Sequence, residues 1–133
     1  MNPSFVEAST LCVLVVDDDA FSRDVTQEML ATEGIIDIQM ADNGHGAMRV
    51  LEYMPEPPDL LICDVFMPDM DGIEFMSELA QRQYQGGVVR VTGVDVQTLA
   101  LARDLASGQG IRILGAFSKP LRQDDLVQML ALR

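Results

Sequence analysis

Short apolar runs alternate with longer amphipathic stretches through most of this chain. The apolar runs are residues 11–16, 35–40, 60–63, 88–91 and 111–117, and the stretches with helical spacing lie near 22–32, 45–54, 73–83, 96–106 and 124–132. Such alternation predicts strands separated by helices. Several runs are apolar at nearly every position, which is typical of a parallel sheet covered on both faces. The sequence therefore predicts an α/β fold with a doubly wound, five-stranded parallel sheet and helices on both faces.

The length and composition limit what this sheet can belong to. The chain has 133 residues, of which 48% are hydrophobic, so a single domain is expected. We expect residues 11–133 to form the domain and residues 1–10 to be a loose extension. Cys12 and Cys63 lie inside apolar runs without CxxC spacing, which favours reduced, buried thiols over a disulfide or a metal site.

The charge balance excludes some partners. The chain has 21 acidic and 9 basic residues, a net charge of −12, which repels phosphate backbones and anionic lipids. Direct binding to nucleic acid or to a membrane surface is therefore not expected. No Lys or Arg precedes Arg23 and the first apolar run is short, so neither a signal peptide nor a membrane span is expected. These features predict a cytoplasmic protein.

Polar and charged residues follow four of the predicted strands. They are Asp17 and Asp18 after the first strand, Asp64 after the third, Thr92 after the fourth and Lys119 after the fifth. In a doubly wound sheet the functional crevice lies at the carboxyl ends of the strands. We therefore expect these five residues to meet at one edge of the sheet.

The chemistry of these residues is complementary. Clustered carboxylates repel one another, and a hard cation such as Mg²⁺ relieves that repulsion while keeping water ligands that a phosphate can replace. Asp64 can then attack a phosphoryl group to form an aspartyl phosphate. Lys119 can hold the phosphoryl oxygens and Thr92 can donate its hydroxyl to them. The strand ends therefore predict a phosphate-accepting site.

With these residues, the sequence resembles the receiver domain of the two-component response-regulator family over nearly all of residues 11–133. The resemblance rests on the acidic pair after the first strand, on Asp64 followed shortly by "MPDMDG", on Thr92, and on Lys119 followed by proline. It implies a flavodoxin-like sheet with the strand order 2-1-3-4-5. It also implies a signalling receiver, which catalyses only its own phosphorylation and dephosphorylation.

The resemblance further implies a donor, a metal and partners. Asp64 would take its phosphoryl group from the phosphohistidine of a sensor histidine kinase or a phosphotransfer protein. The ion would be Mg²⁺, with Mn²⁺ as a substitute, and its ligands would be Asp17, Asp18, Asp64 and the backbone carbonyl of Phe66. The Lys119–Pro120 bond would be cis. Phosphorylation would change the surface over helix four, strand five and helix five, which would control an output domain or bind a second copy.

Two of the departures from the family pattern concern how the domain switches. Family members usually carry an aromatic switch residue three positions before the lysine, where this chain has Ala116. Phe117 is one position closer, and strand alternation would place it on the other face of the sheet unless the strand bulges. The segment between Thr92 and Lys119 is also longer than usual, by about one helical turn. The sequence therefore does not define how the domain switches.

Other functions fit parts of the sequence. A haloacid-dehalogenase-like phosphatase would use Asp17 as the nucleophile and Asp19 as the acid, but Phe21 stands where that family has Thr or Val. A pseudo-receiver would use the fold only for docking, although all five site residues are retained. Within the receiver family, "GIRILGAFSKPL" is similar to receivers fused to EAL-type cyclic-di-GMP phosphodiesterases.

Overall fold

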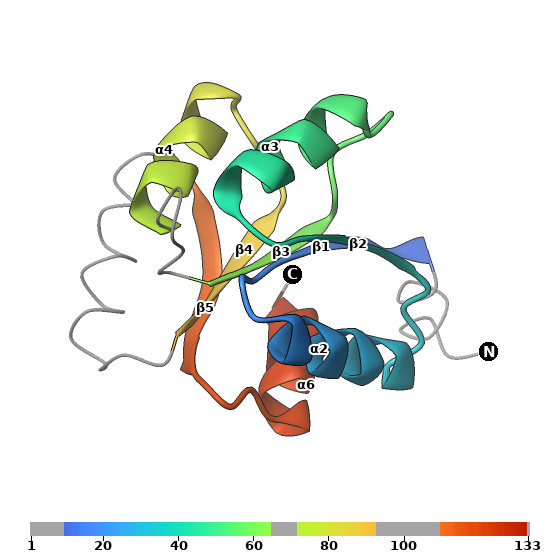
Figure 1. Ribbon diagram of the computed structural model, residues 1–133. Coiled ribbons are helices and arrows are strands. Elements are labelled where there is room, and N and C mark those ends of the chain that lie inside the picture. Colours follow the sequence, from blue (N-terminus) through green and yellow to red (C-terminus); the bar gives the residue numbers. More distant parts are fainter. Residues whose placement is uncertain (1–9, 65–71, 93–109, 133) are drawn as a thin grey trace.

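The computed structural model of the protein describes residues 10–64, 72–92 and 110–132. Its elements are β1 (Cys12–Val16), α2 (Ala20–Thr32), β2 (Asp37–Ala41), α3 (Gly44–Tyr53), β3 (Leu60–Asp64), α4 (Gly72–Gln81), β4 (Gly87–Thr92), β5 (Arg112–Ser118) and α6 (Gln123–Leu132). The strands form one parallel sheet in the order β2-β1-β3-β4-β5. Helices α2 and α6 cover one face and α3 and α4 the other (Figure 1). The predicted fold class and strand order are confirmed, whereas the predicted helix over 96–106 lies outside the described residues.

The hydrophobic core lies on both faces of the sheet. One cluster joins alternate residues of β1 and β3 to Ala47 of α3 and to Phe75, Met76 and Leu79 of α4. The other joins the intervening strand residues to Leu30 of α2 and to Leu126 and Met129 of α6. All five residues of β3 are buried, because this central strand has a strand on either side and helices above and below it.

Short polar side chains begin the helices that lead away from the acidic edge of the sheet. Asp19 caps α2 by accepting a hydrogen bond from the backbone amide of Phe21 at 3.1 Å. Asn43 caps α3 in the same way, by accepting from Gly46 at 2.6 Å. Both side chains satisfy amides that have no partner inside the helix. The caps fix where each helix starts relative to the preceding strand.

The second strand starts later than the apolar pattern predicts. Residues 35–40 form the predicted run, but β2 starts at Asp37, where pairing with Cys12 of β1 begins. Ile35 is fully buried in the cluster beneath α2, although it precedes the strand, and Ile36 is 81% exposed. The apolar pattern therefore includes a loop residue that packs in the core as well as the residues of β2.

A bulge in β5 decides the placement of Phe117. Val88 pairs with Ile113 and Val89 pairs with Gly115, so Leu114 is an extra residue in β5. After this bulge Phe117 pairs with Val91 and packs with the cluster beneath α2 and α6. A Cβ on Gly115 would lie 2.6 Å from Cε2 of Phe117, so glycine makes room for the ring. Phe117 therefore does not take the position of the aromatic switch residue on the face of Ala116.

Within the described ranges, no helix combines the length and the hydrophobicity that crossing a membrane requires.

Candidate functional site

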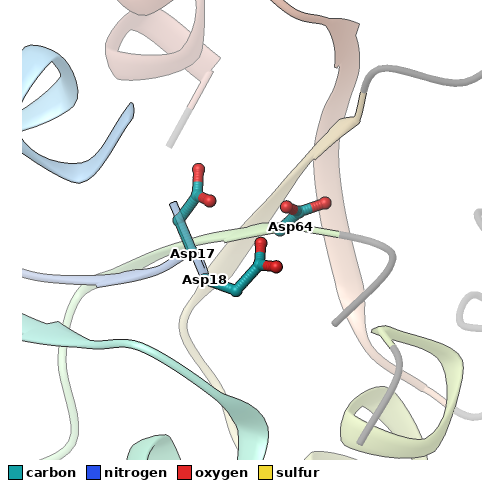
Figure 2. Close-up of side chains that lie close together, drawn as sticks. All are labelled: Asp17, Asp18 and Asp64. Atoms are coloured by element: carbon teal, nitrogen blue, oxygen red, sulfur yellow. The ribbon is translucent and has the colours of Figure 1, made fainter. Parts of the chain in front are cut away.

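Three aspartates from two neighbouring strands meet at the carboxyl edge of the sheet. Asp17 and Asp18 follow β1, and Asp64 is the last residue of β3. One carboxylate oxygen from each lies within 4.8 Å of the others, and Figure 2 shows the three side chains gathered at the two strand ends. Asp17 and Asp64 are 6% and 7% exposed, whereas Asp18 is exposed to solvent. The sequence prediction that these acids lie together is therefore correct.

Lys119 connects two of these carboxylates. Its Nζ lies 3.0 Å from Oδ2 of Asp17 and 3.1 Å from Oδ2 of Asp64. Partial burial lowers the pKa of Lys119, but hydrogen bonds to Asp17 and Asp64 and their charges outweigh burial, so this pKa lies above its usual 10.5. Lys119 therefore stays cationic and offsets part of the repulsion between the acids.

The backbone around Asp17 is held by several hydrogen bonds. Its amide donates to the carbonyl of Ala41 at 3.1 Å, and its Oδ1 accepts from the amide of Asp19 at 2.9 Å. Arg23 of α2 donates from Nη1 to the carbonyl of Asp17 at 2.7 Å. The contribution of Arg23 was missed by the sequence analysis, although an arginine one turn into the helix after an acidic loop is a usable signal. These contacts fix the direction of the Asp17 carboxylate.

The donor set fits a hard divalent cation. Three carboxylates and one ammonium leave two negative charges at the site (−3 + 1 = −2), and Mg²⁺ prefers carboxylate oxygens together with water. In such a site the exposed carboxylate of Asp18 would bind the ion from the solvent side, and the buried carboxylates of Asp17 and Asp64 would bind it from the protein side. The Lys119 ammonium already occupies a cation position between Asp17 and Asp64.

The other predicted site residues are described less completely. Thr92 ends β4, and its Cα pairs with Ser118, the residue before Lys119, so its backbone lies at the same edge of the sheet. Its side chain and the whole of Phe66 lie outside the described part of the structure, and their roles stay predictions. The Lys119–Pro120 bond is cis, as the resemblance implied.

Two cysteines and one arginine are further ionisable residues within the strands. Burial raises the pKa of the Cys63 thiol to about 12, with Arg90 opposing and Asp64 and Asp17 adding to the rise. Burial and the charge of Asp37 likewise raise the pKa of Cys12 to about 11. Both cysteines are unbridged. Cys63 is buried, as predicted, whereas Cys12 is only partly buried, so the prediction of a buried thiol is wrong for Cys12. Arg90 is fully buried, a feature that the sequence analysis missed, although an arginine inside the run "VVRV" is a visible signal.

Comparison with known proteins finds relatives along the whole domain. The family model for the response regulator receiver domain matches residues 13–131. The chain is 32% identical over 117 residues to the chemotaxis protein CheY of Bacillus subtilis, and this alignment covers 82% of this chain and 96% of CheY. It is 34% identical over 123 residues to the transcriptional regulatory protein PdtaR of Mycobacterium tuberculosis, which covers 90% of this chain and 55% of PdtaR.

Solved structures agree with this fold. One is the complex of CheX with CheY, BeF3 and Mg²⁺ from Borrelia burgdorferi, which matches with a TM-score of 0.77 and 23% identity and covers 90% of this chain and 86% of that chain. This likeness shows the fold, and the sequence matches show the family. The chain belongs to the response regulator receiver domain family.

Proposed function

We propose that Asp64 accepts a phosphoryl group from the phosphohistidine of a sensor histidine kinase or a phosphotransfer protein, in a reaction that requires Mg²⁺. The observation that carries this proposal is the Asp64 carboxylate at the end of a buried strand, 3.1 Å from the Lys119 ammonium and beside two further carboxylates. Membership of the receiver family supports the same role. The protein is then a signalling switch and not a metabolic enzyme.

The chemical step needs little from the protein beyond placement and charge. A carboxylate oxygen of Asp64 attacks phosphorus, and the phosphorus–nitrogen bond of the donor breaks. The electron pair of that bond stays on the imidazole nitrogen, which takes up a proton. Lys119 lies within contact distance of Asp64, so its ammonium can pair with an oxygen of the transferred group. Thr92, at the end of the neighbouring strand β4, is proposed to donate a hydrogen bond from its hydroxyl to a second oxygen of the transferred group.

The metal ligands are proposed to be Asp17, Asp18, Asp64 and the backbone carbonyl of Phe66, with Mn²⁺ as a substitute ion. When bound, Mg²⁺ would neutralise charge on the phosphoryl oxygens and on the clustered acids. The BeF3 and Mg²⁺ named for the CheY complex of Borrelia burgdorferi support this assignment. Arg23 and Ala41 hold the backbone of Asp17, and the amide of Asp19 holds its carboxylate, which supports its role as a ligand.

The readout is proposed to lie over the helix predicted at 96–106, β5 and α6. This surface would control an output domain or bind a second copy, in a protein located in the cytoplasm. The chain spans nearly all of Bacillus subtilis CheY but about half of PdtaR, so relatives differ in whether further sequence accompanies the domain. Ala116 lacks the aromatic ring of the usual switch, so the readout is proposed to depend on other side chains.

Reaction with a small phosphodonor tests the proposed function. With Mg²⁺ present, the wild-type protein should gain the mass of one phosphoryl group, and a chelator should prevent the gain. Asp64→Asn should show no gain. Asp19→Asn is the matched control, because asparagine caps a helix as well as aspartate does, and it should react like the wild type. A normal gain of mass in Asp64→Asn would refute Asp64 as the acceptor.

A further inference from the structure

Arg90 lies in the middle of β4, where an arginine is unexpected. It is 0% exposed and, within the described ranges of the chain, has the largest of the fully buried side chains. A guanidinium keeps its charge under all ordinary conditions, and a buried charge is unfavourable unless nearby groups compensate for it. A fully buried cation in this strand therefore points to an electrostatic role.

The position of Arg90 relative to the acceptor is defined by the sheet. Its Cα pairs with Cys63 of β3 on one side and with Ala116 of β5 on the other. Cys63 directly precedes Asp64, so the cation lies on the adjacent strand, one residue from the acceptor.

Strand alternation places Arg90 on the face of the sheet opposite to the Asp64 side chain. Val89 and Val91 belong to the cluster beneath α2 and α6, so Arg90 lies on the opposite face of the sheet, with α3 and α4. Asp64 pairs with Val91 and so lies on the face with α2 and α6, which places Arg90 on the far side of the sheet from the acceptor, separated from solvent.

We infer that Arg90 is a buried cation that favours phosphorylation of Asp64 and disfavours metal binding, through its charge alone and without touching the phosphoryl group. This inference rests on the proposed function. Phosphorylation replaces one negative charge by a group that carries about 1.5 to 2 negative charges, and a buried cation attracts the added charge. The same cation repels a divalent ion at Asp17, Asp18 and Asp64. Removing it should therefore move the two affinities in opposite directions.

The test measures both affinities in charge variants. Calorimetric titration gives the Kd for Mg²⁺ alone and then the Kd for beryllofluoride, a phosphoryl analogue, at saturating Mg²⁺. In Arg90→Met we expect beryllofluoride to bind about tenfold more weakly and Mg²⁺ to bind severalfold more tightly, as for a unit charge at short range in a protein. Arg90→Lys keeps the charge and should stay close to the wild type.

Arg112→Met is the matched control. It removes one arginine from the first position of β5, at the end of the sheet away from the acids, where the side chain is exposed. Each affinity should change by less than about twofold, because solvent and salt screen an exposed charge. Repeating the titrations at high salt should leave the effect of Arg90→Met in place, because salt screens buried charges much less. Should Arg90→Met not fold, Arg90→Gln removes the same charge and carries the same test.

The outcomes separate this inference from the proposed function. Weaker beryllofluoride binding together with tighter Mg²⁺ binding supports it. Unchanged affinities in Arg90→Met, or weakening of both together as in a loosened site, would overturn it, and so would an equal effect in Arg112→Met. Failure of the wild-type protein to bind beryllofluoride would instead overturn the proposed function.

Discussion

Asp18 and Asp19 are adjacent in the sequence but have different surroundings in the structure. Asp18 contributes an oxygen to the acidic cluster, and in the described part of the chain no hydrogen bond or ion pair holds its side chain. Asp19 points to the helix and caps α2 through the amide of Phe21. The run of three aspartates therefore divides into two members of the acidic cluster and a helix cap, which composition alone does not separate.

Substitution of these two residues should separate metal binding from stability. Asp18→Ala removes a carboxylate from the proposed Mg²⁺ site, so the Kd for Mg²⁺ should rise at least about tenfold, while the free energy of unfolding changes little. Asp19→Ala removes the cap, so the free energy of unfolding should fall by about 1 kcal/mol while the Kd for Mg²⁺ stays nearly constant. Calorimetry and denaturant unfolding measure the two quantities. Unchanged Mg²⁺ affinity in Asp18→Ala would show that Asp18 is not a ligand of the ion.

At the scale of elements, the loops at the opposite edge of the sheet are tied together by Tyr84. Tyr84 lies in the loop between α4 and β4. Its hydroxyl donates a hydrogen bond to the carbonyl of Pro58, in the loop before β3, at 2.8 Å. A Cβ on Gly86 would lie 2.8 Å from the same carbonyl oxygen and closer still to the hydroxyl, so glycine leaves space for this contact. Burial, with the charge of Asp59 next in importance, raises the pKa of Tyr84 well above its usual value.

Tyr84→Phe should lower the free energy of unfolding by about 1 kcal/mol at neutral pH, because a buried carbonyl loses its hydrogen bond. This loss should shrink at high pH. The folded state keeps the Tyr84 proton while the unfolded chain releases it above about pH 10, so the wild type loses stability as pH rises through that range. Denaturant unfolding from neutral to alkaline pH measures the difference between the two proteins.

Tyr53→Phe is the control for this prediction, because Tyr53 is 85% exposed. It should match the wild type at every pH. A difference between wild type and Tyr84→Phe that stays constant or grows with pH would contradict the linkage between burial of the Tyr84 hydroxyl and stability.

The elements also show what the sequence can predict. The β3 run is apolar and fully buried, so its pattern locates the strand within one residue. Gly115 lies next to the β5 bulge and leaves room for Phe117. A glycine inside a strand is a signal of a bulge, but it does not give the register. The placement of Asp17, Asp18, Asp64 and Lys119 at one edge of the sheet was predictable because these residues end or follow strands, but the pairing of Lys119 with both Asp17 and Asp64 depends on how the chain leaves β5.

For the whole molecule, the net charge of −12 makes general ionic effects and specific metal binding easy to confuse. Any salt screens repulsion among the acids and so stabilises the fold. A bound ion adds stability through mass action, by about 2.7 kcal/mol at a concentration of about 100 times its Kd. The two effects separate when ionic strength is held constant.

Magnesium chloride should therefore raise the melting temperature more than sodium chloride does at the same ionic strength. In Asp18→Ala the two salts should give nearly equal increases, because only screening remains. Thermal unfolding followed by circular dichroism measures this. Equal effects of both salts on the wild type would show that the acidic cluster does not bind Mg²⁺, as expected of a receiver-like domain used only for docking.

The position of the phosphoryl group tests the central claim most directly. After reaction with a small phosphodonor and Mg²⁺, borohydride reduction converts an aspartyl phosphate to homoserine, and peptide mass spectrometry locates the converted residue. The account predicts homoserine at Asp64, with Asp17, Asp18 and Asp19 unchanged. Homoserine at Asp17, as a haloacid-dehalogenase-like phosphatase would give, would contradict it, as would a phosphorylated protein in which Asp64 is intact.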